Sequence, residues 1–161
     1  SATWAAYQGI ASSKHSPVLN GKVFEALVAT ALLKEGVRPL FAEATITFIP
    51  NVRFDLVLYS KNHGPVVLSL KTSLRERYKQ ADLEGMFLRN VHRKALSYLI
   101  TTDADECNNV NNKIKKGDVL GIDKCVLATD PAFDVLVKEL VSIKLIEPPV
   151  VSVLESNRII K

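Results

Sequence analysis

Three ionisable residues in one short stretch of the chain are of types suited to phosphodiester hydrolysis. Asp55 lies in the apolar run Phe54–Leu58, Lys71 ends a second apolar run, and Glu84 follows Lys71 after twelve intervening residues. An acid and a lysine embedded in apolar strands cost free energy unless they are paired or functional. Mg²⁺ prefers carboxylate oxygens and takes one or two of them together with a substrate phosphate. The pattern predicts an Mg²⁺-dependent hydrolytic centre; the alternative is a structural ion pair of Asp55 and Lys71.

Glu84 decides between these two interpretations. With about 100° of rotation per residue, it lies at the margin of the buried stripe of its predicted helix. A marginal acid beside the end of the preceding strand can reach Asp55 and Lys71, and Asp55 and Glu84 would then hold the metal. The alternative is a solvated glutamate paired with Lys79 or Gln80.

Ser69 and Glu25 are the remaining candidates for this centre. Side chains alternate along a strand, so Ser69 shares a face with Lys71. Glu25 lies on an earlier predicted helix among apolar residues. We expect it either to point a carboxylate toward the metal site or to be a partly buried acid with its own partner.

A charged triplet directly follows the second apolar strand, and its members are Arg75, Glu76 and Arg77. Arginine donates two hydrogen bonds to guanine and glutamate accepts from the cytosine amino group, so the triplet can read adjacent G·C pairs in a major groove. The alternative is a capping box formed by Ser73 and Glu76. Lys79 and Arg89 would add phosphate contacts or form a solvated face.

The elements that position these residues predict an α/β fold with a mixed central sheet flanked by helices. The unbroken apolar run within the third strand indicates a central strand that is covered on both faces. The first predicted helix begins at Asn20 and ends at Gly36, and the others span Leu74–Arg93, Asp103–Gly117 (helical at best) and Ala132–Leu140. The predicted strands are Thr45–Ile49, Val52–Ser60, Pro65–Lys71, Ala95–Thr101 and Val119–Ala128.

The bulk properties fit one domain over residues 1–161, with 1–19 as a short N-terminal segment. The net charge of +4 permits a polyanionic partner without requiring one. Two cysteines make no disulfide framework, and no signal peptide or membrane-spanning run is visible, so we expect an intracellular protein without membrane association. Ser1 is not a natural start residue, which is consistent with a trimmed chain or a fragment.

Together these residues resemble the PD-(D/E)XK nucleases, and more narrowly the restriction endonucleases of the EcoRII and PspGI group, which read CC–GG type sites. In that branch the second acid of the strand motif is supplied by the following helix, and a basic–acidic–arginine triplet follows the lysine. Asp55, the run Ser69–Lys71, Glu84 and the triplet match this pattern. Phe54 stands where the family usually has proline.

The resemblance implies a type II restriction endonuclease of a prokaryotic cytoplasm that cuts double-stranded DNA and leaves 5′-phosphates. It implies that Asp55 and Glu84 hold Mg²⁺, that Lys71 activates water, that Ser69 replaces the lost acid and that Glu25 supports the site. A homodimer is the natural match to a two-fold symmetric site. The alternatives are a repair, junction-resolving or nicking nuclease of the same fold, and a DNA-binding module whose active site has decayed.

Overall fold

The computed structural model describes residues 2–9 and 16–149. Its helices are α1 (Ala2–Gln8), α2 (Pro17–Lys34), α3 (Arg77–Val91), α4 (Ala104–Lys116) and α5 (Pro131–Ser142). Its strands are β1 (Phe41–Ala44), β2 (Phe54–Ser60), β3 (Gly64–Lys71), β4 (Leu96–Thr101) and β5 (Lys124–Leu127). Among the described helices, none is long and apolar enough to cross a lipid bilayer.

The strands form one mixed sheet in the order β1-β2-β3-β4-β5. β1, β2 and β3 pair antiparallel, whereas β3, β4 and β5 are parallel. The β2–β3 hairpin is tight because the Ser60 hydroxyl accepts hydrogen bonds from the backbone N–H groups of Asn62 and His63. β3 and β4 end together, with Lys71 opposite Thr101, so the segments that follow them start from the same edge of the sheet.

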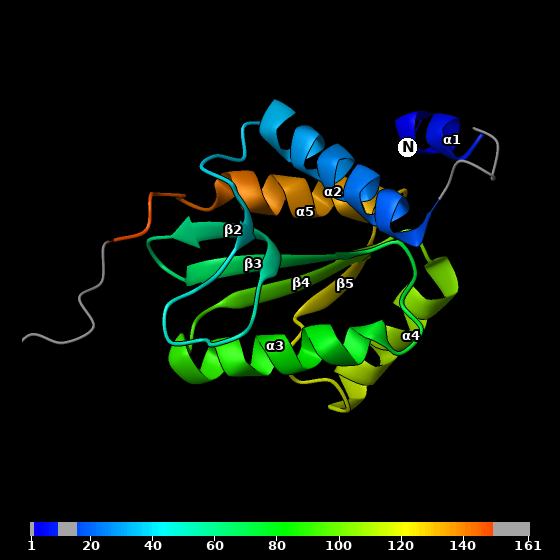
Figure 1. The fold of residues 1–161 in the computed structure, drawn as a ribbon. Helices are drawn as coiled ribbons and strands as arrows, with labels where there is room; N and C mark the ends of the chain where they lie inside the picture. The colour runs from blue at the N-terminus through cyan, green and yellow to red at the C-terminus, as the bar shows by residue number, and fades with distance from the viewer. Residues whose placement is uncertain (1, 10–15, 150–161) are drawn as a thin grey trace, which may run out of the picture.

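Helices cover both faces of this sheet (Figure 1). One face packs against α2 and α5 through a cluster that includes Phe24, Leu68 and Leu136. The other face packs against α3 and α4, where Tyr78 and Val110 are buried. Residues 65–70 of β3 are all buried, which confirms the predicted central strand.

The predicted first strand, Thr45–Ile49, is wrong. β1 lies just before it, and Ala44 pairs with Phe54 of β2. The chain must turn within residues 45–53 to enter β2 antiparallel, so this segment has no free strand to pair with. The segment is a loop instead, in which Ile49 is buried in one cluster with Phe54 and Ile46 packs against that cluster, whereas Thr45 and Thr47 are exposed.

Two other predicted boundaries differ from those of the structure. The first long helix begins at Pro17 rather than Asn20, since the Ser16 hydroxyl accepts from the Leu19 N–H and proline suits the first helical turn. The expected strand Val119–Ala128 shortens to β5. Residues 117–123 form the loop that contacts α3 instead.

Candidate active site

Asp55 and Lys71 meet at the end of the sheet where β3 finishes. The Lys71 Nζ lies 2.9 Å from Asp55 Oδ2, and the same oxygen accepts from the Leu70 N–H at 2.6 Å. Their side chains are 14% and 19% exposed for Lys71 and Asp55, so the pair is partly desolvated and more costly than a surface ion pair. Both bonds use Oδ2, and neither the Leu70 N–H nor the Lys71 ammonium bonds to Asp55 Oδ1. The pair alone fits both a structural and a catalytic role.

Glu84 of α3 lies within electrostatic reach of this pair. Burial raises the pKa of the Glu84 carboxyl, a hydrogen bond from Gln80 and the charge of Lys71 lower it, and the charge of Asp55 raises it. The bond from Gln80 Nε2 is 2.8 Å long, as in the alternative of a glutamate paired on its own helix. Lys79, however, pairs with Glu76 instead. Glu84 is therefore a half-buried acid beside two charged groups rather than a solvated one.

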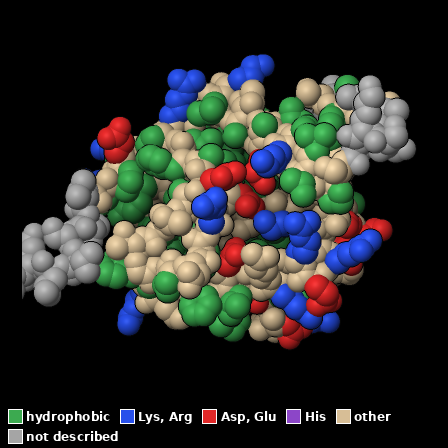
Figure 2. Space-filling model, viewed as in Figure 1, with side chains coloured by type: hydrophobic (Ala, Val, Ile, Leu, Met, Phe, Trp, Pro, Cys, Tyr) green, Lys and Arg blue, Asp and Glu red, His purple; other side chains and the backbone are tan. Residues whose placement is uncertain are grey.

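Glu25 approaches the same place from α2, on the other side of the sheet. Burial raises the pKa of the Glu25 carboxyl, the charge of Asp55 raises it further, and Lys71 lowers it. Glu25 and Asp55 line one shallow hollow. Figure 2 shows acidic side chains gathered between α2 and α3, with Lys and Arg side chains on both sides. The negative charges of Glu25 and Asp55 repel each other, and a bound cation would relieve that repulsion.

Ser69 is 4% exposed and lies two residues before Lys71 on β3. Val67, on the same face of the strand, packs beside Leu88 of α3. Ser69 and Lys71 thus face α3, the helix that carries Glu84. Because Ser69 is neutral, β3 supplies no carboxylate to the candidate site. The carboxylates come instead from Asp55 on β2, Glu25 on α2 and Glu84 on α3.

The triplet is exposed at the start of α3. The side chains of Arg75, Glu76 and Arg77 all lie open to solvent, and Arg75 has a φ of 39° in the left-handed region. The capping-box alternative is wrong, because Glu76 is the N-cap residue itself and makes no side-chain capping bond. Glu76 pairs with Lys79, one turn into the helix. The helix begins at Arg77 rather than Leu74, which leaves the preceding turn free to present the triplet.

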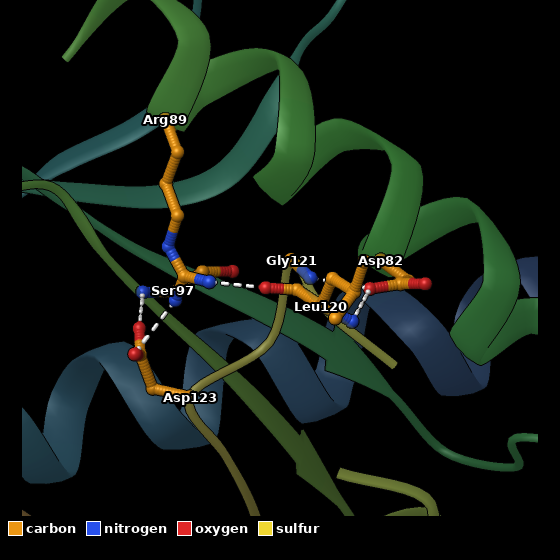
Figure 3. Close-up of polar contacts among 6 residues, drawn as sticks. All are labelled: Asp82, Arg89, Ser97, Leu120, Gly121 and Asp123. Carbon is orange, nitrogen blue, oxygen red and sulfur yellow. Dashed lines mark hydrogen bonds and ion pairs between the residues drawn. The ribbon is translucent and has the colours of Figure 1, made fainter. Parts of the chain in front are cut away.

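Helix α3 is bonded to the loop before β5 through Asp82 and Arg89, which lie on either side of Glu84 in the sequence (Figure 3). Asp82 Oδ1 accepts from the backbone N–H groups of Leu120 and Gly121, at 2.9 and 2.5 Å. Arg89 donates to the Leu120 carbonyl and pairs with Asp123 at 2.6 Å. Arg89 therefore has a structural role within the protein, and the phosphate contact expected of it stays a prediction.

The donors in this region suit a hard divalent cation. No group of three or more His, Cys, Asp and Glu side chains stands ready as a metal cage among residues 2–9 and 16–149. Mg²⁺ needs no such cage, since it keeps several waters and takes one or two carboxylates plus phosphate oxygens. Asp55 and Glu84 offer carboxylate oxygens, and no soft ligand lies among the charged residues that act on Glu84. The residues present fit Mg²⁺.

Helix α4 carries polar residues that the sequence pattern did not single out. Lys113 donates to the Tyr78 hydroxyl at 2.5 Å, and its Nζ lies 4.5 Å from the centre of the Tyr78 ring. Asn109 and Asn112 line a groove with Arg75 and Glu76. The helical spacing of these asparagines was visible in the sequence, but the neighbouring helix start was not.

The mixed sheet with helices on both faces is a restriction-endonuclease-like α/β fold. Among solved structures, the chain is similar to the restriction endonuclease PspGI in its complex with substrate DNA, with a TM-score of 0.58 and 21% sequence identity. The match covers 84% of this chain and 58% of the PspGI chain, so this chain spans little more than half of that enzyme's length. No family model and no curated protein matches the sequence. At this identity the likeness establishes the fold.

Proposed function

We propose that this chain is an Mg²⁺-dependent endonuclease of double-stranded DNA, and specifically a type II restriction endonuclease for a CC–GG type site. The observation that supports the proposal is the Asp55–Lys71 ion pair at the end of β3, with Glu84 of α3 within electrostatic reach of both residues and an exposed Arg-Glu-Arg triplet following the strand. The shared fold with PspGI, whose structure was solved with substrate DNA, supports it.

Asp55 and Glu84 would hold the metal ion, which when bound neutralises phosphate charge and acidifies water. Asp55 accepts a hydrogen bond from the Lys71 ammonium at 2.9 Å and so would keep that cation at the site during the reaction. From there the ammonium orients the attacking water and stabilises the charge that develops on the phosphate. Glu25 supports the site from α2. Attack in line with the departing 3′-oxygen leaves a 5′-phosphate.

The triplet would read the G·C pairs. Arg75 and Arg77 donate to guanine edges, Glu76 accepts from a cytosine amino group, and Lys79 contacts a phosphate. All four side chains are exposed. The ion pair of Glu76 and Lys79 must open for this, which costs little because both side chains are more than 60% exposed.

Cleavage of supercoiled plasmid DNA in Mg²⁺ tests the proposal. Lys71→Ala and Glu84→Gln should abolish cleavage while largely sparing DNA binding. Matched controls are Lys61→Ala, at the far hairpin, and Glu35→Gln, beyond the end of α2; both side chains are exposed and should leave cleavage unchanged. Wild-type turnover in either site variant would refute the assigned roles.

The digest also separates the proposal from its alternatives. Discrete bands support a restriction enzyme, whereas a smear or structure-dependent cutting supports a repair, junction-resolving or nicking nuclease. The absence of cleavage in both Mg²⁺ and Mn²⁺, with DNA binding retained, supports a decayed binding module. In that case the neutral Ser69, where the strand motif has an acid, would reflect the loss of the active site.

A further inference from the structure

Helix α4 stands beside the N-terminal end of α3, at the edge of the sheet where β3 and β4 finish (Figure 1). A polar groove runs between the two helices. From the α3 side it is lined by Arg75, Glu76 and Tyr78, and from the α4 side by Glu106, Asn109, Asn112, Lys113 and Lys116.

Three of the four asparagines on α4 have no structural task. Asn111 has one, because its amide donates to the Cys125 carbonyl at 2.8 Å and accepts from the Cys125 N–H at 3.0 Å, which caps the edge strand β5. Asn108, Asn109 and Asn112 are exposed, and within the described residues their side chains form no hydrogen bond to the protein. Asparagine is a poor helix former, so these residues lower the stability of α4, and no side-chain hydrogen bond within the described residues compensates for that loss.

The lysines of α4 have an internal explanation only in part. Lys113, Lys115 and Lys116 lie in the last turn, where cations interact favourably with the helix dipole. That interaction does not require Lys113 to lie against the Tyr78 ring. It also does not explain the exposed amides of Asn109 and Asn112, which lie before the last turn. Lys113 joins α4 to the first turn of α3 and so holds the groove next to the triplet.

The groove chemistry matches a DNA duplex. Asparagine amides pair with the N6 and N7 edge of adenine, and lysines contact phosphates. Asn109, Asn112 and Lys116 follow one another at intervals of three and four residues, which places them on one face of the helix. Of the two acids in the groove, Glu76 already pairs with Lys79, and Glu106 lies in the first turn of α4.

We propose that the groove face of α4 binds the same DNA duplex as the triplet, with Asn109 and Asn112 on base edges and Lys116 on a phosphate. This inference rests on the proposed function and extends it from G·C reading at the start of α3 to A·T reading by a second helix.

Equilibrium binding to two labelled duplexes tests this inference. One duplex carries a CC–GG site flanked by A·T pairs, and the other has the same composition in scrambled order. The double variant Asn109→Ala and Asn112→Ala should lose about tenfold or more in affinity for the site duplex and little for the scrambled one. Alanine favours a helix more than asparagine does, so α4 remains folded, which circular dichroism verifies.

The same helix supplies the controls. Asn108 and Lys115 are exposed on α4 but do not line the groove, so Asn108→Ala and Lys115→Ala should bind both duplexes like the wild type. Lys116→Ala should weaken both duplexes and lower the slope of log K against log salt by about 1.

Wild-type affinity in the double variant, an equal loss on the scrambled duplex, or an equal loss in Asn108→Ala would each overturn the inference. Failure of the proposed function gives a different result, in which the wild-type protein cuts no DNA in Mg²⁺ or Mn²⁺. If the wild-type protein still binds the site duplex, the double variant tests the inference as before; if it binds neither duplex, the inference falls as well.

Discussion

Gly85 and Gly121 form the closest backbone approach between α3 and the loop before β5, and Gly85→Ala tests how far Glu84 depends on it. A Cβ at Gly85 would lie 2.7 Å from the Gly121 carbonyl carbon and 3.1 Å from its Cα, where 3.4–4 Å is ordinary contact. Helix and loop must therefore separate by about 1 Å, and overpacking of this kind costs about 1–3 kcal/mol. The loop bonds to Asp82 and Arg89 would lengthen together.

Alanine itself favours a helix over glycine by about 1 kcal/mol, so we expect a net loss of up to about 2 kcal/mol in the free energy of unfolding. The adjacent Glu84 would move with the helix, and a displacement of about 1 Å in a catalytic group can cost about 100-fold in rate. Urea denaturation measures the first effect and single-turnover plasmid cleavage the second.

Gly21→Ala is the matched control. Gly21 lies within α2, and a Cβ there meets nothing within 4 Å. The same substitution should therefore stabilise the protein by about 0.5–1 kcal/mol. Equal effects of the two substitutions on stability would refute the close approach, and full cleavage by Gly85→Ala would refute its role in placing Glu84.

Two further predictions concern the charge of Glu84 and the edge of the sheet. Burial raises the pKa of Glu84 above its ordinary value of 4.5, so the folded state holds this proton more tightly than the unfolded state and loses that stabilisation as the pH rises through the raised pKa. Glu84→Gln should therefore raise the Tm of the metal-free protein at about pH 8 and lose this advantage below pH 4.5, as a thermal melt at each pH will measure; an equal gain at both pH values would contradict the cause. Asn111→Ala removes both bonds to Cys125, leaves backbone groups of β5 unpaired, and should lower the free energy of unfolding by about 1–3 kcal/mol in urea titration, while Asn112→Ala should not.

Elements with strong local patterns were predictable from the sequence. The burial of β3 follows from its unbroken apolar run, and the buried stripe of α3, from Tyr78 to Leu88, follows from helical periodicity; both are confirmed. The prediction of a strand over residues 45–49 was wrong because their β-branched composition is typical of both a strand and a loop that packs on a core. The choice was made by the antiparallel entry into β2, which depends on residues outside the segment.

The candidate site was predictable in its residues and less so in its surroundings. Spacing along the chain predicted that Asp55 and Lys71 pair and that Glu84 comes near them, since a hairpin and the following helix are local structures; the pair is confirmed, and Glu84 lies within its electrostatic reach. The two roles that the sequence concealed depend on long-range contacts. Arg89 is occupied by Asp123, and Lys113 lies against Tyr78, which is 35 residues earlier.

The most direct test of the proposed function is to digest a plasmid of known sequence with Mg²⁺ and to sequence the fragment ends. We expect ends with 5′-phosphates that cluster at one short CC–GG type sequence, and no such ends from Lys71→Ala. Ends scattered over the plasmid would contradict a restriction enzyme, and intact plasmid in both Mg²⁺ and Mn²⁺ would contradict a nuclease altogether.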